Sequence, residues 1–234
     1  MQARQGVMRL GEALAGAMAE LGIAGYGNAT RLSMTELADI NRREAVRMTV
    51  RDALRQWSRV PERFRGARLG RLSASELPIN WRKSWYLSGH VGSGKTHAAY
   101  AIYHQWLSEY VHLSRLRGIH IWPRGVRIEY MPDLMNGLRA MVGNDQADLE
   151  GATQRLEECP RLILDDLGAG LQSEYADDIL LRLLEARYNN GLYTGFTSNH
   201  KIGETGYNDR ILSRIAGIVG SNKAELKGKD RRVG

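Results

Sequence analysis

The chain has 234 residues, of which 43% are hydrophobic and 25% are charged, and its formal net charge is +7. This composition is typical of a globular protein, and no apolar run approaches the roughly 20 residues that span a bilayer, which argues against a membrane partner. The single cysteine, Cys159, excludes an internal disulfide and a cysteine-based zinc cluster, so we expect it to be a small core residue in a cytoplasmic protein.

The positive charge lies mainly in the first third of the chain. Residues 1–80 contain 13 Lys and Arg against 8 Asp and Glu, a net +5. This excess indicates an acidic partner, either nucleic acid or an acidic protein face. A solvated arginine-rich helix is the alternative interpretation.

Two helical segments are predicted before residue 60. Residues 3–21 show the spacing of an amphipathic helix, and a second helix is expected from about residue 34 to Trp57, with Ser33 and Glu36 as a capping box. Val60 and Pro61 end it, because the residue before a proline avoids the helical region. Arginines recur every four residues along this second helix, at Arg43, Arg47, Arg51, Arg55 and Arg59.

From about residue 61, short apolar strands alternate with helices, which is typical of a parallel α/β sheet. The expected strands are 85–87, 126–130, 162–165, 193–197 and 223–226, and the expected helices lie near 95–110, 132–142, 145–158, 173–189 and 207–217. The connection Val111–Arg124 is rich in Arg, His and Trp, and we expect an exposed loop or hairpin there.

The segment Gly89–Thr96 matches the phosphate-binding loop pattern G-x-x-x-x-G-K-[ST] between an apolar strand and a helix. Its glycines let backbone N–H groups face phosphate oxygens, Lys95 carries the charge that meets the β- and γ-phosphates, and the Thr96 hydroxyl can bind Mg²⁺. We therefore expect ATP with Mg²⁺ as the cofactor. The predicted ATP-binding residues are Gly89, His90, Val91, Gly92, Ser93, Gly94, Lys95, Thr96 and His97.

The second element is an apolar strand that begins at Arg161 and ends in the acidic pair Asp165 and Asp166. This is the Walker B pattern of P-loop ATPases. Asp165 is predicted to hold Mg²⁺, and Asp166 is predicted to orient and polarise the attacking water. Alone, such a strand is also consistent with an ordinary acidic turn.

Two later elements complete the predicted catalytic set. Asn199 follows the strand 193–197 and could hydrogen-bond the attacking water or the γ-phosphate, although an asparagine there could also cap the next helix. Arg210 and Arg214 are four residues apart and share a helix face. An arginine supplied by a neighbouring subunit stabilises charge on a transferring phosphoryl group, and we favour Arg214 for this role.

These elements, in this order, resemble the AAA+ superfamily and, more closely, the DnaC/IstB-like group of bacterial helicase loaders and transposase helper ATPases. The likeness covers about residues 60–234 and includes a Pro-x-Arg-Phe-Arg lead-in at 61–65, the core motifs at 94–97, 162–168 and 197–199, the pair Arg210 and Arg214, and the closing segment 226–232. The connection 111–125 departs from the group.

The resemblance implies a P-loop AAA+ core with a parallel five-stranded sheet flanked by helices, without a C-terminal lid, at 60–234, and a small all-α partner-binding region at 1–59. It implies an ATP-dependent loader of the replicative hexameric helicase that binds single-stranded DNA and forms a homo-oligomer with ATP sites at subunit interfaces. The alternative is an IstB-like helper that assembles on duplex DNA and delivers a transposase. A third hypothesis makes 34–57 a DNA-reading helix–turn–helix.

Overall fold

The computed structural model describes residues 34–121, 125–141, 146–169 and 174–227, without the side chains of 146–148. The predicted helix at 3–21, the capping residue Ser33 and most of the closing segment 226–232 lie outside these ranges. The chain divides into two compact units, 1–41 and 42–234, so the division falls within one helix, α2 (Met34–Ser58). The second unit contains the sheet and every predicted site residue.

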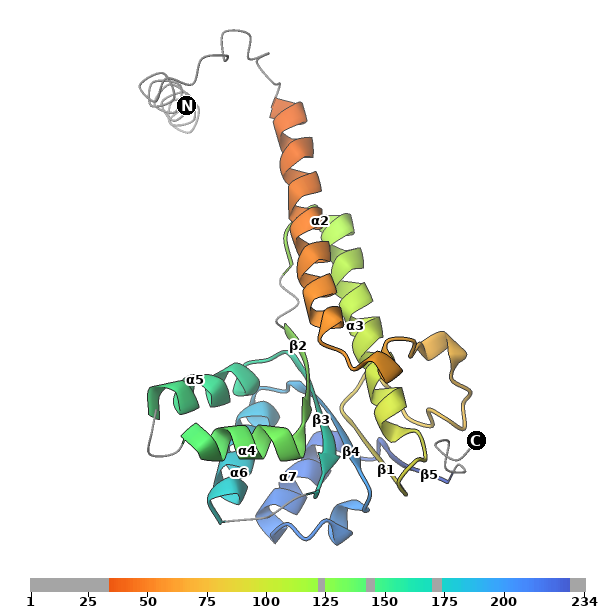
Figure 1. Ribbon diagram of the computed structural model, residues 1–234, viewed down its shortest axis with the longest axis vertical. Helices are drawn as coiled ribbons and strands as arrows, with labels where there is room; N and C mark the ends of the chain where they lie inside the picture. The colour runs from red at the N-terminus through yellow and green to blue at the C-terminus, as the bar shows by residue number, and fades with distance from the viewer. Residues whose placement is uncertain (1–33, 122–124, 142–145, 170–173, 228–234) are drawn as a thin grey trace. The chain divides into compact units, whose positions relative to one another are not determined.

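The centre of the second unit is a five-stranded parallel sheet with the order β2-β3-β4-β1-β5 (Figure 1). The strands are β1 (Trp85–Gly89), β2 (Val126–Tyr130), β3 (Arg161–Leu167), β4 (Tyr193–Ser198) and β5 (Lys223–Leu226). The helices are α3 (Lys95–Arg117), α4 (Met131–Met141), α5 (Gln146–Glu157), α6 (Glu174–Asn189) and α7 (Asp209–Val219), with short 3₁₀ turns η1 (Glu62–Phe64), η2 (Leu69–Arg71) and η4 (Ile202–Glu204). The predicted five-stranded parallel sheet is confirmed.

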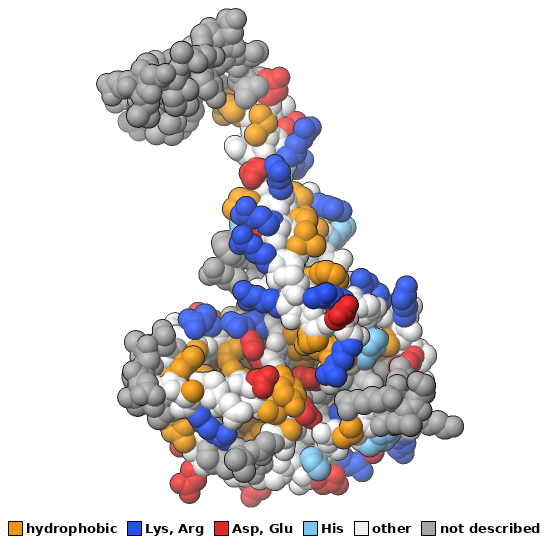
Figure 2. Space-filling view, viewed as in Figure 1, with side chains coloured by type: hydrophobic (Ala, Val, Ile, Leu, Met, Phe, Trp, Pro, Cys, Tyr) orange, Lys and Arg blue, Asp and Glu red, His pale blue; other side chains and the backbone are white. Residues whose placement is uncertain are grey.

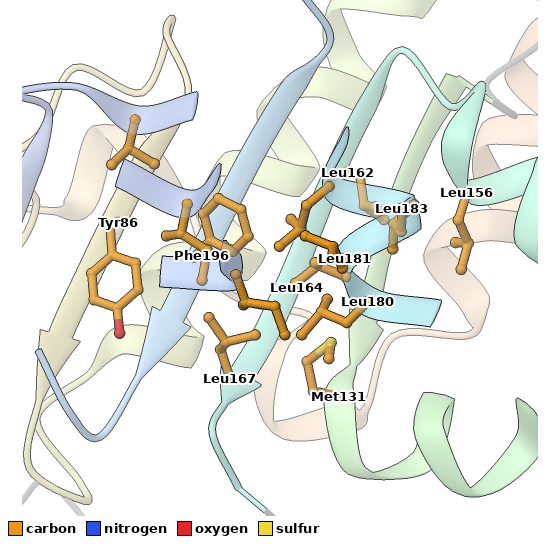
Figure 3. Close-up of a cluster of buried hydrophobic side chains, with 14 residues drawn as sticks. Tyr86, Met131, Leu156, Leu162, Leu164, Leu167, Leu180, Leu181, Leu183 and Phe196 are labelled. Carbon is orange, nitrogen blue, oxygen red and sulfur yellow. The ribbon is translucent and has the colours of Figure 1, made fainter. Parts of the chain in front are cut away.

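Apolar side chains fill both faces of the sheet, because successive residues of a strand point to opposite sides. On β3, Leu162 and Leu164 join a buried cluster with α6 and α7, which Figure 3 shows, whereas Ile163 joins a second cluster with α3. Cys159 is buried beside this sheet, as expected, and its thiol donates to the Arg161 carbonyl oxygen over 3.3 Å. None of the described helices is long and apolar enough to cross a membrane.

The helix–turn–helix hypothesis for residues 34–57 is wrong. The segment forms one uninterrupted helix, α2, which leaves no turn between two helices. The sequence over this stretch has neither glycine nor proline, so nothing in it breaks the helical hydrogen bonds. The second predicted helix is therefore confirmed, and the segment does not form the helix–turn–helix that would enter a DNA groove.

The predicted loop or hairpin at Val111–Arg124 is also wrong over its first half, because α3 continues to Arg117. The helix ends at Gly118, whose φ of 63° is left-handed and whose N–H donates to the Ser114 carbonyl over 2.8 Å. A Cβ at Gly118 would also lie 2.4 Å from Nε of Arg42, an exposed side chain that would then have to move. The signals for this end were present in the sequence, namely basic residues in the last turn and a following glycine. Trp122 and Arg124 lie outside the described residues.

Candidate nucleotide-binding site

The loop between β1 and α3 has the backbone of a phosphate cradle. Gly89, Gly92 and Gly94 have φ values of 150°, 82° and 99°, which residues other than glycine rarely adopt. A Cβ at Gly89 would lie 2.5 Å from the Leu226 carbonyl oxygen on β5, so the loop could not approach the sheet with a larger residue. Gly94 caps α3 without a side-chain hydrogen bond, which suits the N-terminus of this helix to an anion.

Lys95 is the buried cation of this loop. Its side chain is almost completely buried, and Nζ donates to the carbonyl oxygens of Gly89 and His90 over 2.7 and 2.9 Å. A third hydrogen bond, of 3.0 Å, runs to Oδ1 of Asn199 on the neighbouring β4 side. These contacts fix the ammonium at the mouth of the loop, where phosphate oxygens would meet it.

The two acidic residues of β3 are held in different conformations. Asp166 has a φ of 63°, and the register between β3 and β4 shifts between Leu164 and Leu167. Thr197 of β4 holds both acids, since its hydroxyl donates to Oδ1 of Asp165 over 2.6 Å and accepts from the Asp166 backbone N–H over 2.9 Å. A left-handed non-glycine residue costs free energy and is found most often at functional sites. The irregularity turns Asp166 away from the regular strand.

Asp165 is buried, and this burial raises the pKa of its carboxyl group above the ordinary value. Hydrogen bonds from Thr197 and Thr96 and the charge of Lys95 act in the opposite direction, and the charge of Asp166 adds to the rise. A carboxylate next to the Thr96 hydroxyl is an oxygen donor set that suits Mg²⁺, which usually takes one or two protein ligands and completes its shell with water and phosphate. The described residues contain no cluster of three or more His, Cys, Asp or Glu that could hold a metal alone.

Asn199 connects the phosphate loop with the acidic pair. Its Nδ2 donates to Oδ1 of Asp166 over 2.9 Å, while its Oδ1 accepts from Lys95. The next helical turn, η4, begins after Lys201, so the alternative that Asn199 serves as a helix cap is not what the side chain does here. Tyr130 adds a longer hydrogen bond of 3.4 Å to Oδ2 of Asp166.

A cavity of about 1190 Å³ opens on this group of residues. Six residues of the predicted loop line it, together with the acidic pair and Asn199: Val91, Gly92, Gly94, Lys95, Thr96 and His97. The sequence analysis missed another part of its wall, formed by Arg59, Arg63 and Phe64, with the Phe64 ring stacked on Tyr100 at 4.6 Å. The Pro-x-Arg-Phe-Arg lead-in was the available signal, but nothing in the sequence indicated where this segment lies.

The two arginines of α7 do not line this cavity. Arg210 is exposed, whereas Arg214 lies over the Tyr188 ring at 5.0 Å and 3.5 Å from a carboxylate oxygen of Glu185. The structure therefore does not bring either arginine to the loop of its own chain. Whether either arginine acts on the nucleotide site of a second subunit is therefore the role to be tested.

A comparison with solved structures finds related folds. A putative primosome component from Streptococcus pyogenes serotype M3 is 22% identical with a TM-score of 0.52, and the match covers 74% of this chain and 93% of that chain. A structure named DnaI is 24% identical with a TM-score of 0.51, and the match covers 76% of this chain and 100% of that chain. No protein-family model and no curated protein matches the chain. The expected fold, a five-stranded parallel sheet flanked by helices, is confirmed.

Proposed function

We propose that the chain is a Mg²⁺-dependent ATPase of the AAA+ helicase-loader type. The observation that carries the ATPase proposal is the hydrogen-bonded chain Lys95–Asn199–Asp166, which joins the phosphate loop to the residue best placed to act on water. Through this link, Asn199 can respond to the γ-phosphate beside Lys95 and at the same time orient the carboxylate of Asp166. Gly89–Thr96 would hold the phosphates, and Thr96 and Asp165 would hold Mg²⁺, which neutralises charge on the phosphoryl group.

Asp166 orients and polarises the attacking water in this proposal, and Asn199 fixes the direction of its carboxylate. Burial raises the pKa of the Asp165 carboxyl group, and a cation bound beside it would stabilise the ionised form that burial disfavours. Arg214 acts on the ATP of a neighbouring subunit, with Arg210 as the second candidate, so the active form is a homo-oligomer with sites at subunit interfaces. Catalysis then depends on positioning and electrostatics more than on covalent chemistry.

Two variants test the ATPase proposal. Lys95→Ala should abolish nucleotide binding, because the loop loses the charge that meets the phosphates. Asp166→Asn should retain ATP and lower turnover by about 10²–10⁴-fold, the usual contribution of a positioned acid–base group. Equilibrium binding of a fluorescent ATP analogue and steady-state phosphate release measure the two effects. Near-normal ATP affinity of Lys95→Ala would refute the site.

The loader function rests on the fold shared with a primosome component and on the basic N-terminal third of the chain. We propose that residues 1–59 bind the replicative hexameric helicase and that the ATPase domain, 60–234, binds single-stranded DNA when ATP is present. ATP binding and hydrolysis would act as a switch that holds and then releases the helicase. In this proposal, residues 1–59 bind the helicase, and the ATPase domain determines when the helicase is released.

The loader proposal is tested by fluorescence anisotropy on single-stranded and duplex DNA at fixed salt, with and without the host helicase. A preference for single strands, with the helicase joining the complex, is expected for a loader. ATP-dependent growth on duplex DNA without helicase capture would instead indicate a transposition helper. Omitting ATP is the control, because a switch must respond to the nucleotide.

A further inference from the structure

Helix α2 carries four exposed arginines at intervals of four residues, Arg43, Arg47, Arg51 and Arg55, and the exposed Arg59 follows just after its last residue; these five are here called the arginine row. Figure 2 shows Lys and Arg side chains gathered over this helix. Each step of four residues advances about 6 Å along a helix and turns about 40°. The part of the row on the helix, Arg43 to Arg55, is therefore about 18 Å long, and it winds partly around the helix rather than forming a straight line.

Little negative charge opposes this row within the helix. Between residues 42 and 59 the only acids are Glu44 and Asp52, against six arginines. Glu44 is 4.0 Å from Arg47, and both side chains are well exposed, so this pair contributes little. Asp52 is mostly buried and accepts from Nε2 of His120 at 3.0 Å, while its other oxygen is 3.9 Å from Arg55. The row keeps most of its positive charge toward solvent.

The opposite side of α2 is fixed to the ATPase domain. Thr49 is fully buried and accepts a 2.9 Å hydrogen bond from the Ile121 N–H, and Trp57 packs against the cluster that includes α3. The contact of Asp52 with His120 at 3.0 Å adds a second polar link on this side. A helix anchored in this way presents its arginines in one arrangement, which lowers the entropic cost of binding.

The chemistry of the row favours a polyanion over a protein face. Protein interfaces depend on an apolar centre with few charges, but the apolar residues beside the row are either half-buried, as Val46 and Val50 are, or exposed and far apart along α2, as Ile40 and Leu54 are. Arginine forks bind phosphate oxygens in pairs, and a repeated charge along a rod matches a repeated phosphate. We propose that the arginine row binds the phosphate backbone of single-stranded DNA, which places a DNA contact on α2 in addition to any on the ATPase core.

The inference deepens the loader proposal, because it rests on DNA being a substrate and assigns a surface to it. Other arginines of the ATPase domain are placed less favourably for such a contact. Arg127 is paired with Glu129 at 2.8 Å, Arg124 lies outside the described residues, and Arg115 and Arg117 are exposed but only two in number. Arg59 also lines the nucleotide cavity, so it is left unchanged in the test.

The test is the salt dependence of binding to a fluorescent oligothymidylate of about 20 nucleotides. Arg43, Arg47 and Arg51 are changed together to Gln in the full chain. Each phosphate contact on a single strand contributes about 0.7 to the slope of log Kobs against log salt, so the slope should fall by about 2 in magnitude over roughly 50–200 mM salt. A matched variant that changes three exposed cations of the ATPase domain, Arg71, Lys83 and Lys223, to Gln should keep the slope.

ATPase activity without DNA and helicase capture are measured on the same samples. A lower slope with unchanged basal ATPase supports the row as the DNA contact. An unchanged slope, in a wild type that binds DNA, overturns the row and leaves the loader proposal standing. Loss of helicase capture with an unchanged slope identifies the row as a protein surface and also overturns the inference. A wild type that binds no DNA refutes the DNA part of both proposals.

Discussion

The strongest test of the packing concerns Arg187 of α6, which is fully buried without an ion pair to a carboxylate among the described residues. Burial lowers the pKa of its guanidinium to about 10, so the group stays protonated at neutral pH. Nη1 donates to the carbonyl oxygens of Leu156 and Cys159 at 2.7 Å each, Nη2 donates to that of Tyr193 at 2.5 Å, and Nε donates to Oγ1 of Thr194 at 2.9 Å. One side chain of α6 thus joins α5, the connection that precedes β3, and β4.

Arg187→Lys keeps the charge and most of the length but removes the planar fork. The lysine ammonium would lie near the position of Cζ, one bond short of Nη1, and by turning toward Leu156 and Cys159 it could keep those two bonds, whereas those to Tyr193 and Thr194 would be lost. Hydrogen bonds to a charged group contribute about 1.5–3 kcal/mol each, so the loss of two should cost about 3–6 kcal/mol. The cost of burying the cation remains, since lysine is also charged. This is a large part of a typical stability of about 5–15 kcal/mol.

Urea unfolding followed by circular dichroism measures the effect, and the midpoint should fall by about 1 M or more. Arg182→Lys is the matched control on the same helix, because Arg182 pairs with Glu150 and Glu157 while its side chain is 50% exposed. An exposed ion pair contributes about 0–1 kcal/mol, so this variant should differ little from the wild type. Equal midpoints for the two variants would refute the reasoning.

Three further predictions concern the site. Asn199→Ala should lower kcat by about 10²–10³-fold with ATP affinity retained, because Asp166 and Lys95 lose their common partner; steady-state kinetics measure this, and an unchanged kcat would contradict the link. Asp165→Asn should stop Mg²⁺-dependent hydrolysis yet raise the free energy of unfolding at pH 7, because the raised pKa means that the ionised form is the less stable one in the fold. That gain should shrink as the pH falls through the raised pKa of the wild-type carboxyl group, which then becomes protonated too, and urea unfolding at neutral and at acidic pH checks it. Arg214→Ala should impair hydrolysis without weakening ATP binding by the monomer, and adding a Lys95→Ala subunit should restore activity if Arg214 acts between subunits; failure of this complementation would exclude that role.

The sequence by itself was sufficient for the elements in which neighbouring residues determine the structure. The loop Gly89–Thr96 and the acidic pair at the end of β3 were predicted because an apolar strand, a glycine-rich turn and a helix follow one another along the chain. The five strands were found because both faces of a parallel sheet are covered, which makes each strand a short apolar run. The uninterrupted helix α2 was predicted for similar reasons.

Only the tertiary structure determined which distant residues meet. Asn199 can form hydrogen bonds with both Lys95 and Asp166 because β4 lies between β1 and β3 in the sheet. The order of strands in a sheet cannot be predicted from the local sequence of any one strand. The same holds for Arg63 and Phe64 beside the cavity and for the buried Arg187, whose residue type predicts exposure. Local sequence determines backbone preference through short-range sterics and hydrogen bonds, whereas contacts between distant segments depend on how complete faces pack. That packing is decided by the whole chain at once.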